Sequence, residues 1–579
     1  MHTLGINAAF HDCSAALVRD GLVVAAAEEE RFTRIKHGKR PVPFSTWQLP
    51  YHAIDYCLQE AGIHLRDVDH IAYSFDPALL IPALAPDGRM SLPLEPSAAR
   101  HVEGNGSPWD PLFLSYIINA PRQLVDGVPH HLQQRYAGTT LDHVMARWQF
   151  VEHHLSHEAS AFLASPYQEA AVLTMDGRGE RASTSYGHYR DGKYERLRQI
   201  NLPHSLGLLY EEVTRYLGFL HSSDEYKVMA LASYGRPAYV NEFREILRSD
   251  DAGGYTVEPS RLVARFGPAR IRGASFDAQH MDIAHSLQQV LEETVLDMAR
   301  WLHHTTQSPN LCMAGGVALN CVMNGRLAAE GPFDNIWVQP AAGDAGTSLG
   351  AALWVDSLNR ETTDRSWEMD HAYLGPAFDD EEIEAFLQRS RTPYTRLDDI
   401  AEVTATLLAD EKIIGWFQGR MEFGPRALGA RSILASPRDS AMQSRLNELK
   451  DREDFRPVAP VVLAERAHEW FDARGKPSIT APFMLFVFDV LADKADQIPA
   501  VRHTDGTARV QTVTRGQHPV LHRLLQAFEQ KTGVPVLVNT SFNTRGEPVV
   551  CTPRDALESF WTSPLDALVI GSFLVEKTR

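Results

Sequence analysis

Short apolar runs separated by polar turns begin the chain. The run "TLGIN" is followed by "SAALVRDGLVVAAAEEE", in which Asp20 and Gly21 divide two apolar stretches. An Asp-Gly pair between two β-type runs predicts a hairpin. The pattern returns in "AAVLTMDGRGERASTSYGHYRDGKYERLRQI", again with an Asp-Gly pair between its later runs. Both copies have an aspartate in their first turn, Asp12 and Asp176, so we predict a duplicated β-meander.

The middle of the chain alternates strand-like and helix-like patterns. In "DIAHSLQQVLEETVLDMARWLHHTT", which begins at Asp282, apolar residues recur every three or four positions and predict a helix. The stretches "NLCMAGGVALNCVMNGRLAAE" and "NIWVQPAAGDAGTSLGAALWV" each predict a strand, a glycine-rich turn and a helix. This alternation is typical of an α/β fold that has ligand-binding loops at its strand ends.

A polar and charged stretch, "SLNRETTDRSWEMD", divides the chain. We place a boundary near residue 370, between an N-terminal domain of residues 1–368 and a C-terminal domain of residues 369–579. The second part begins with the helical pattern "DIAEVTATLLADEKIIGWFQG" and ends with "GVPVLVNTSFNTRGEPVV" and "LDALVIGSFLV", which each predict a buried strand. A chain of 579 residues is too long for one hydrophobic core, which agrees with this division.

The formal net charge of −18 disfavours nucleic acid and anionic membranes as partners, because both would repel such a surface. Five cysteines at irregular spacing, with no CxxC pair, indicate reduced thiols. The first residues lack the basic segment and the long apolar run of a signal peptide. No run of about 18 uncharged apolar residues occurs. We therefore expect a cytoplasmic protein without a membrane or nucleic-acid partner.

Three histidines lie within five residues in "VEHHLSHEASA". If this stretch is helical, His153 and His157 lie on one face, one turn apart, and can bind one divalent metal ion. The HExxH pattern of zinc proteases is absent, because position 161 is alanine. On this stretch alone, a polar helix face with hydrogen-bonded histidines is the simpler interpretation. A metal also needs carboxylates, and Asp176 and Asp344 are candidates because both lie in glycine-flanked turns.

These glycine-flanked turns, "MDGRGE" and "AAGDAGTSLG", suit an anion or a ribose hydroxyl, since glycine lets backbone N–H groups point inward. Neither is a Walker A motif or a Rossmann fingerprint, and most Asp-Gly turns are only turns. The stretch "AGGVALN", from Ala314 to Asn320, fits an adenosine-binding turn and close strand–helix packing equally well. In "SSDEYKVMALASYG", Asp224 precedes an apolar helix, where helix capping is the simplest interpretation.

The segment from Arg420 to Arg456 is locally basic. It holds seven arginines and one lysine against six acidic residues, within a chain of charge −18. The arginines around its turns, including Arg426 and Arg431, do not form a helix stripe, and guanidinium groups match phosphate oxygens. The stretch "VNTSFNTRGEP" adds amide and hydroxyl donors at a strand end, namely Asn539, Ser541 and Asn543. We predict a phosphate site here.

Seven motifs follow one another along nearly the whole chain: "HDCSAALVRDG", "AAAEEERFTRIKH", "HHLSHEASAF", "EYKVMALASYG", "EFGPRALGARSILASPR", "FRPVAP" and "NTSFNTRGEP". Together they resemble the O-carbamoyltransferases of natural-product biosynthesis and nodulation factors. Cys13 departs from the usual first motif, and Ala230 and Ser233 stand in the fourth where glycine and proline are more usual. The segment from about residue 80 to 140 matches no motif of that family.

This resemblance implies a duplicated actin/sugar-kinase-like domain, of the type in tRNA threonylcarbamoyl-transfer enzymes, followed by a YrdC-like α/β domain that makes acyl adenylates. In the C-terminal domain, carbamoyl phosphate and ATP, with Mg²⁺, would give carbamoyl adenylate. The N-terminal domain would then transfer the carbamoyl group to a hydroxyl of a small-molecule acceptor.

The resemblance also implies roles for residues at matching positions. The catalytic residues of acyl transfer would be His11, Asp12, Lys36 and Asp224, with His11 and Asp224 at the acceptor hydroxyl and Lys36 at the carbonyl oxygen. The ligands of a divalent metal, expected to be Fe(II), would be His153, His157, Asp176 and Asp344. The adenylate would contact Gly177, Glu225, Gly315, Gly316 and Asn320. Carbamoyl phosphate and ATP would contact Arg426, Arg431, Lys450, Arg456, Arg509, Asn539, Ser541 and Asn543.

Two other functions fit parts of the sequence. A threonylcarbamoyl enzyme acting on tRNA would share the fold, but the net charge of −18 counts against RNA binding. A nucleotide-binding regulatory protein without chemistry would leave the arginine-rich segment without a purpose.

The acceptor is the least determined part of the prediction. The stretch "PWDPLFLSYIINAPRQLVDGVPHHLQQRY", from Pro108, is rich in large apolar residues and precedes the histidine motif. It favours a hydrophobic polyketide such as a macrolide over an aminosugar or a nodulation-type oligosaccharide, unless it is only a helical packing insert. A homodimer is expected on general grounds.

Overall fold

The computed structural model describes residues 1–38, 49–80, 114, 116–126, 135–360, 365, 367–474, 478–544 and 546–577. The apolar segment from Pro108, on which the polyketide prediction depends, lies largely outside these residues.

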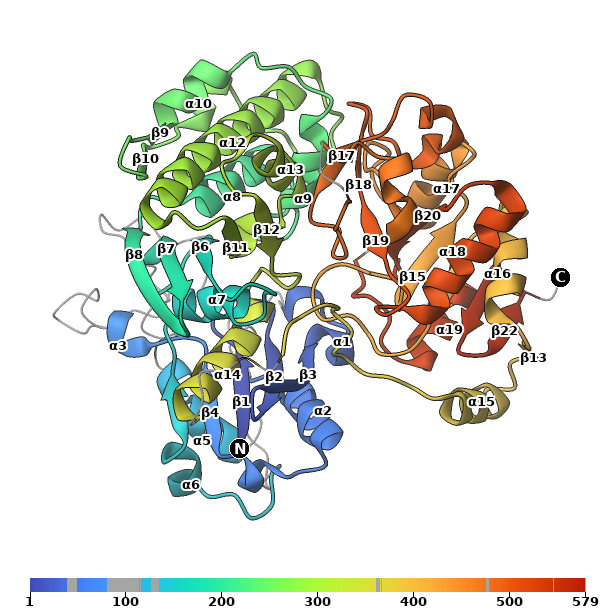
Figure 1. Cartoon of the computed structure of the whole chain (residues 1–579), viewed down its shortest axis with the longest axis horizontal. Coiled ribbons are helices and arrows are strands. Elements are labelled where there is room, and N and C mark those ends of the chain that lie inside the picture. The colour runs from blue at the N-terminus through green and yellow to red at the C-terminus, as the bar shows by residue number, and fades with distance from the viewer. Residues whose placement is uncertain are drawn as a thin grey trace.

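Two five-stranded sheets with the same strand order form the first part of the chain (Figure 1). The first has the order β3-β2-β1-β4-β5 and the second the order β8-β7-β6-β11-β12. In each sheet, two parallel strands extend an antiparallel meander. The strands of the first sheet are β1 His2–Asn7, β2 Ser14–Arg19, β3 Leu22–Glu28, β4 His70–Tyr73 and β5 Trp148–Phe150. Those of the second are β6 Ala170–Met175, β7 Ala182–Arg190, β8 Lys193–Asn201, β11 Asn310–Ala314 and β12 Asn335–Val338.

The predicted duplication is confirmed, turn by turn. Asp20 and Gly21 join β2 to β3 with φ values of 49° and 83°, and Asp191 and Gly192 join β7 to β8 with φ values of 52° and 71°. Two successive residues of positive φ form the tight turn that matches the twist of a hairpin, and Asp and Gly tolerate that conformation best. The repeated topology confirms an actin/sugar-kinase-like α/β fold.

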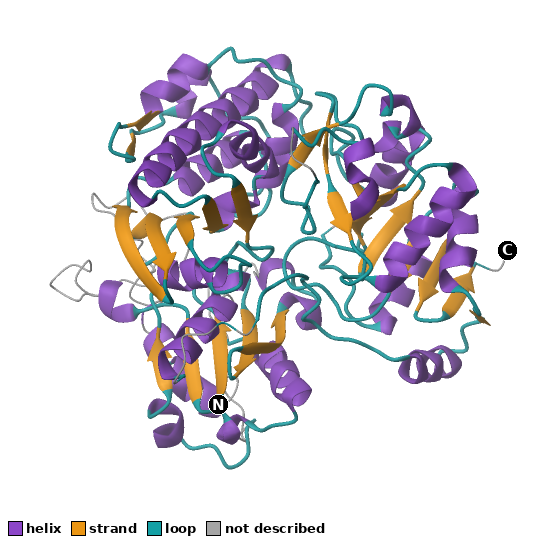
Figure 2. Cartoon of the chain, viewed as in Figure 1, coloured by secondary structure: helices purple, strands orange, loops and turns teal. Residues whose placement is uncertain are grey.

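Helices α7 (His153–Phe162) and α14 (Ala345–Asn359) lie between the two sheets (Figure 2). α7 packs on β6, β7 and β11, whereas α14 packs on β1, β2, β4 and on α7 itself. Glycine permits this close approach: a Cβ atom at Gly350 would overlap the carbonyl of Ser156 on α7, and one at Gly5 would overlap the carbonyl of Ser348. The helix pair brings the histidine motif and the Asp344 turn to one point.

The predicted helix in the middle of the chain is α12, Ala278–Thr306. It begins before Asp282 because the side chain of Asp277 caps it, accepting the backbone N–H of His280 at 3.1 Å. The two strand-turn-helix predictions are also confirmed, as β11 followed by α13 (Cys321–Glu330) and as β12 followed by α14. The other longer helices of this part are α2 Tyr51–Ala61, α8 Leu206–Tyr216, α9 Glu225–Ala232 and α10 Val240–Ile246.

An eight-stranded mixed sheet forms the last part, with the order β13-β22-β21-β14-β15-β20-β16-β19. Its strands are β13 Thr395–Arg396, β14 Ile414–Phe417, β15 Arg431–Ala435, β16 Ala459–Leu463, β19 Gln511–Val513, β20 Val536–Ser541, β21 Ala567–Ile570 and β22 Phe573–Glu576. Helices α16 (Ile400–Ala409) and α18 (Pro519–Thr532) pack side by side over it (Figure 1). Its further helices are α15 Asp380–Arg389, α17 Ala441–Leu449 and α19 Pro553–Thr562.

The stretch "LDALVIGSFLV" differs from the single strand we predicted. It forms the antiparallel pair β21 and β22, because Gly571 turns the chain with a φ of 53°. The apolar run alone hides this turn.

The segment after β3 docks on loops of the C-terminal part. Arg31 is 3% exposed and donates to the carbonyl of Gly424 at 2.8 Å, while Arg34 donates to the carbonyl of Val549 at 2.6 Å. The Glu28 carboxylate accepts the backbone N–H of Gly424 at 2.9 Å. These bonds hold the short helix α1 (Glu30–Thr33) and the turn at Lys36–Gly38 between the two parts. The domain boundary near residue 370 stays a prediction.

Candidate active site and metal centre

Four buried side chains converge between the two sheets. His153 and His157 project from the first turns of α7, Asp176 follows β6, and Asp344 precedes α14. One ligand atom from each lies within 4.8 Å of the other three. All four are at most 7% exposed. The helix predicted for the histidine motif is therefore present, and we call these four residues the metal group.

The distances between the nitrogen and oxygen atoms of the metal group fit a shared metal ion better than direct hydrogen bonds. Nε2 of His153 lies 3.7 Å from oxygens of both Asp176 and Asp344, and Nε2 of His157 lies 3.6 Å from Asp344. These distances are too long for hydrogen bonds. Ligand atoms about 2.1 Å from a shared ion stand roughly 3 to 3.5 Å apart, which is close to this arrangement.

Several polar atoms of the metal group have no hydrogen-bond partner among the described residues. They are Nε2 of His153, both ring nitrogens of His157 and both carboxylate oxygens of Asp344. Leaving such atoms buried without partners is costly, so they call for a ligand. Two imidazoles and two carboxylates suit a divalent transition metal.

Surrounding hydrogen bonds orient the metal group. Nδ1 of His153 contacts the carbonyl of Ser74 at 3.2 Å, which leaves the Nε2 lone pair facing the carboxylates. Asp176 accepts the backbone N–H of Gly316 at 2.8 Å. The backbone N–H of His153 donates to Glu180 at 2.9 Å, and burial raises the pKa of Glu180 to about 7.

The charges within the metal group offset one another. Burial opposes protonation of His153, but the carboxylates of Asp344 and Asp176 outweigh it and raise the pKa of His153 to about 9. Burial likewise opposes ionisation of Asp176, yet the neighbouring histidines hold its pKa well below the usual range. His154 stands apart: it contacts Ser185 at 3.1 Å, and burial lowers its pKa, so its ring is neutral.

Two of the residues predicted for acyl transfer, His11 and Asp12, lie beside the metal group. Nε2 of His11 lies 3.8 Å from Asp344, and its Nδ1 lies 3.0 Å from Asp12. Asp12 also contacts Nδ1 of His37 at 2.9 Å. Although burial opposes ionisation, His37 and His11 hold the pKa of Asp12 well below the usual range. His37 was not among the predicted residues.

Asp12, His37 and Glu30 form a second group with metal-ligand spacing, but their atoms already have protein partners. Glu30 accepts the backbone N–H of His37 at 2.7 Å and pairs with Arg31 at 2.9 Å. We therefore assign no metal to this second group.

Asp224 is not the helix cap that we predicted. Its side chain makes no capping hydrogen bond to α9, because it accepts the backbone N–H of Leu220 at 3.1 Å and lies 3.3 Å from the Lys227 ammonium. Lys227 also contacts Glu453 of the C-terminal part at 2.9 Å. Asp224 is thus fastened to the junction of the two parts.

Three of the predicted adenylate residues, Gly177, Gly315 and Gly316, follow the ends of β6 and β11 beside the metal group, whereas Glu225 begins α9. Gly315 has a φ of 88°, and a Cβ atom there would overlap the carbonyl of Met175. This close approach fits the packing interpretation of "AGGVALN". Ser205 donates to the carbonyl of Gly177 at 2.7 Å, and Glu225 accepts the backbone N–H of Ser222 at 2.6 Å.

The side chain of Asn320 is already paired. It caps α13 by accepting the backbone N–H of Met323 at 3.0 Å and exchanges hydrogen bonds with Gln288 at 2.8 and 3.1 Å. A contact between Asn320 and an adenylate would have to replace one of these bonds.

A group of like charges gathers in the C-terminal part, and we call it the cation cluster: Arg426, Lys450, Arg452, Arg456 and Arg509. Burial, followed by the neighbouring charges, lowers the pKa of Arg426 and of Arg452 to about 9 and holds that of Lys450 well below its usual range. With a pKa of about 9, the guanidinium groups of Arg426 and Arg452 are still protonated at neutral pH. The lowered pKa values reflect the free-energy cost of burying several positive charges close together.

The cation cluster has few acids to offset it. Among the described residues, only Arg456 of the five has an ion pair, at 3.7 Å from Glu453. Nε of Arg426 and one terminal nitrogen of Arg452 are buried without a hydrogen-bond partner among the residues that the structure describes. Arg452 was missed by our sequence prediction, although it belongs to the basic segment that the prediction singled out.

The cation cluster faces the N-terminal part. The Arg456 guanidinium stacks over the ring of Tyr226 with 4.7 Å to its centroid, and Arg426 reaches the carbonyl of Leu319 at 3.5 Å. Burial and then the charges of Arg452 and Arg456 lower the pKa of Lys450 most, and the charge of Lys36 lowers it further. Lys36, which we predicted to act in acyl transfer, thus lies near the cation cluster.

Arg431 differs from its predicted role. It is fully buried, donates to the carbonyls of Gln418, Gly419, Ala430 and Pro376, and stacks on the ring of Phe417 at 3.6 Å. A guanidinium that satisfies backbone carbonyls in the core stabilises the fold and does not face a phosphate.

The remaining predicted donors surround Lys450. Its ammonium donates to Ser541 Oγ at 3.1 Å and to the side-chain oxygen of Asn543 at 2.8 Å. Asn539 is 1% exposed and donates to Gln511 at 2.7 Å, so it supports this loop from behind.

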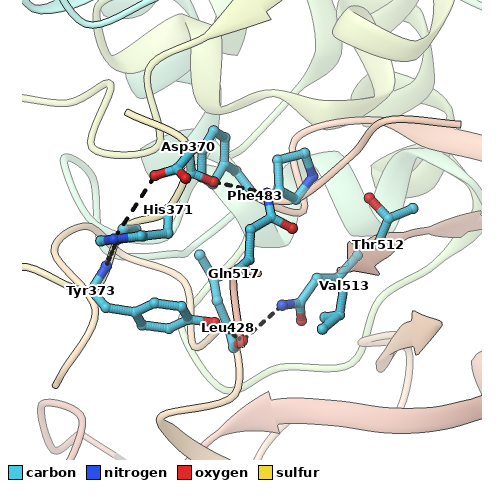
Figure 3. A pocket seen from close by; sticks show the side chains of 11 residues that line it. Asp370, His371, Tyr373, Leu428, Phe483, Thr512, Val513 and Gln517 are labelled. Atoms are coloured by element: carbon cyan, nitrogen blue, oxygen red, sulfur yellow. Dashed lines mark hydrogen bonds and ion pairs between the residues drawn. The ribbon is translucent and has the colours of Figure 1, made fainter. Parts of the chain in front are cut away.

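A small pocket is lined by residues that include Tyr373, Leu428 and Gln517 (Figure 3). Tyr373 and Gln511 both donate to the carbonyl of Leu428, at 2.8 and 2.7 Å, and Gln517 donates to the carbonyl of Asp370 at 2.8 Å. The pocket holds none of the predicted site residues, and its polar groups are paired, so we assign it no ligand. In the described part of the chain, no helix combines the length and apolar character needed to cross a bilayer.

Comparison with known proteins covers both parts. The chain is 42% identical over 623 aligned residues to an uncharacterised protein of Synechocystis, covering 100% of this chain and 97% of that protein. It is 40% identical over 586 residues to the nodulation protein NolNO of Sinorhizobium fredii, covering 99% of this chain and 80% of that protein. The structure of full-length HypF matches with a TM-score of 0.33 at 12% identity, over 63% of this chain and 47% of that one, which is too weak to support an argument.

Residues 2–353 match the family described as Carbamoyltransferase N-terminus, and residues 405–577 match Carbamoyltransferase C-terminus. The chain therefore belongs to the carbamoyltransferase family of enzymes.

Proposed function

We propose that this carbamoyltransferase works in two steps, one at the cation cluster and one beside the metal group. In the first step, carbamoyl phosphate, ATP and one water give carbamoyl adenylate, phosphate and pyrophosphate. In the second, the carbamoyl group moves from the adenylate to a hydroxyl oxygen of the acceptor, and AMP leaves with one proton released. The sum of the two steps is an ATP-dependent O-carbamoyl transfer.

The observation that carries this proposal is the cation cluster. Five basic side chains share one half-buried site, with a single ion pair to an acid among the described residues. ATP with carbamoyl phosphate would supply the missing negative charge. Guanidinium groups fixed at developing phosphate charge lower the barrier to phosphoryl and adenylyl transfer, and Mg²⁺ commonly shares that task.

The second step would use the residues between the cluster and the metal group. Lys36 lies on the side of the cations, where its ammonium can polarise the carbamoyl carbonyl. His153, His157, Asp176 and Asp344 would hold the metal, for which Fe(II) is the expectation. When bound, the metal would supply positive charge for the phosphate of the adenylate.

The proposed acceptor is a hydroxyl of a nodulation-type oligosaccharide or a related aminosugar. Two relatives over most of this chain are nodulation proteins, NolNO at 40% identity and NolO at 42% identity. The apolar segment that favoured a polyketide lies largely outside the described residues, so nothing further supports that choice.

Purified protein with ATP and carbamoyl phosphate tests the proposal. We expect pyrophosphate release that requires carbamoyl phosphate. Release that instead requires threonine with bicarbonate would favour the threonylcarbamoyl alternative, and ATP binding without any release would favour a regulatory protein. A mass-spectrometric screen of oligosaccharides, aminosugars and polyketides for a gain of about 43 Da, which is one carbamoyl group in place of one hydrogen, then identifies the acceptor.

A further inference from the structure

His37, Asp12 and Ser223 come from three separate segments and form a hydrogen-bonded chain. Nδ1 of His37 contacts Asp12 at 2.9 Å, and Nε2 of His37 contacts Ser223 Oγ at 2.9 Å. The three are neither exposed nor buried, which suits groups that meet a substrate. This is the geometry in which a carboxylate orients a histidine toward a hydroxyl that loses its proton.

The hydrogen bonds define which ring nitrogen of His37 is basic. His37 and His11 hold the pKa of Asp12 well below the usual range despite burial, so its carboxylate only accepts hydrogen bonds. A neutral His37 must therefore carry its proton on Nδ1, toward Asp12. The Nε2 lone pair then points at the hydroxyl of Ser223.

Backbone strain at the same place is an independent observation. Asp12 and His37 have φ values of 51° and 59°, and Ser222, next to Ser223, has a φ of 54°. Residues other than glycine adopt this left-handed conformation infrequently, although Asp and His tolerate it better than most, and it gathers at functional sites where the fold maintains it. Three residues of positive φ therefore lie at the point where the imidazole of His37 faces the hydroxyl of Ser223.

Other candidate bases are already engaged. Nδ1 of His11 contacts Asp12 at 3.0 Å, and its Nε2 is directed at the metal group, 3.8 Å from the carboxylate of Asp344. The Asp224 carboxylate lies 3.3 Å from the Lys227 ammonium. The partner of His37 Nε2 is instead a neutral hydroxyl, which another hydroxyl can replace without loss of charge pairing.

We propose that His37 is the general base that deprotonates the acceptor hydroxyl, with Ser223 Oγ occupying the position of that hydroxyl in the acceptor-free chain. The inference rests on the proposed function. As Nε2 takes the proton, the acceptor oxygen bonds to the carbamoyl carbon and the bond from that carbon to the AMP phosphate oxygen breaks. AMP leaves, and His37 releases its proton to solvent.

A covalent role for Ser223 is less suited to this chemistry. Carbamoyl-serine would be an alkyl carbamate, the same type of ester as the final product. Forming it would discard the activation that adenylate formation created, because the second transfer would then have almost no driving force. Direct attack by the acceptor, assisted by His37, keeps that activation for the product-forming step.

The test separates three reactions of the full-length protein. Carbamoyl-phosphate-dependent pyrophosphate release reports adenylate formation. Transfer to a chitin tetrasaccharide and to water reports attack by hydroxyl groups, which need a base. Trapping by hydroxylamine to give hydroxyurea reports adenylate delivery, because neutral hydroxylamine attacks without prior loss of a proton.

We expect His37→Asn and His37→Gln to lower transfer to the tetrasaccharide and to water by roughly 10² to 10⁴-fold, while pyrophosphate release and hydroxylamine trapping stay within about threefold of wild type. The matched control His304→Asn, on the exposed end of α12, should change none of the three reactions. Ser223→Ala should lower transfer by less than about tenfold, since it removes only a placeholder.

Three results would overturn the inference: unchanged transfer in the His37 variants, parallel loss of all three reactions in them, or a carbamoylated Ser223 peptide in wild type. Absence of carbamoyl-phosphate-dependent pyrophosphate release in wild type is a different result. It contradicts the proposed function itself and removes this inference with it.

Discussion

Among the described residues, the metal group and the cation cluster both contain buried polar atoms without a hydrogen-bond partner, but the two groups differ in the signs of their charges. The metal group mixes imidazoles with carboxylates, so the pKa of His153 rises to about 9 while that of Asp176 falls. The cation cluster contains one sign only, and the pKa values of Arg426 and Arg452 both fall to about 9.

The difference indicates two kinds of ligand. A mixed set of nitrogen and oxygen donors at near-ligand spacing is balanced by a cation that replaces protons. A set of positive charges alone is balanced only by anions. We therefore propose that one chain holds a cation site and an anion site, with Lys36, Asp12 and His37 between them, as a reaction divided into activation and transfer would require.

Removing one metal ligand should have the largest effect. We expect His153→Ala to lose bound metal and to lower carbamoyl transfer by roughly 10³-fold or more, because the site then lacks one of its donors. Metal analysis of the purified protein and a transfer assay measure this. The exposed His304→Asn variant is the control, and a His153→Ala protein with full metal content and full transfer would refute the assignment.

Removing one arginine of the cation cluster should affect adenylate formation. We expect Arg509→Met to lower carbamoyl-phosphate-dependent pyrophosphate release by roughly 10² to 10³-fold, with metal content unchanged. The folded protein should lose little stability, since the change removes a charge that pairs with no acid in the described part of the chain. Arg523→Met, at an exposed arginine on α18 that pairs with Asp399, is the matched control. Unaltered pyrophosphate release in Arg509→Met would count against the anion site.

The metal-free protein should lose stability as pH rises. The pKa of His153 is about 9 in the folded chain against an ordinary value of 6.5, so its protonation stabilises the fold fully below pH 6.5 and not at all above pH 9. The free energy of unfolding should therefore fall by at most about 3 kcal/mol between these two pH values. Denaturant unfolding of chelator-treated protein at pH 6.5 and 9 measures it, and His153→Asn should reduce the change. A metal-free protein that is more stable at pH 9 would contradict this account.

The ion pair that joins the two parts should matter least. Lys227 and Glu453 are 2.9 Å apart, with side chains 16% and 31% exposed. A double-mutant cycle with Lys227→Met and Glu453→Gln should give a coupling free energy below about 1 kcal/mol, because solvent screens the pair. A coupling several times larger would mean that this contact, and not the docked segment around Arg31, holds the parts together.

Local patterns made much of the fold predictable. Two Asp-Gly pairs predicted the hairpins of both meanders, and the four-residue spacing of His153 and His157 predicted a shared helix face. Each depends on residues close in sequence, where backbone preferences act directly. Asp176 and Asp344 were reached as candidates because both lie in glycine-flanked turns.

Side-chain direction in loops was not predictable in the same way. Arg431 looks like the other arginines of its segment, yet it turns inward to backbone carbonyls. Asp224 turns to Lys227 and does not cap its helix. His37 meets Ser223 across 186 positions of sequence, through turns of positive φ that no periodicity reveals. Such contacts depend on tertiary packing, which short-range patterns do not encode.

The central claim is that activation and transfer occur at separate sites. The most direct test compares the His153→Ala and Arg509→Met variants in their rates of carbamoyl-phosphate-dependent pyrophosphate release. We predict that His153→Ala releases pyrophosphate at close to the wild-type rate although it transfers no carbamoyl group, whereas Arg509→Met loses the release. Equal loss of pyrophosphate release in both variants would mean that the two groups serve a single site and would contradict the account.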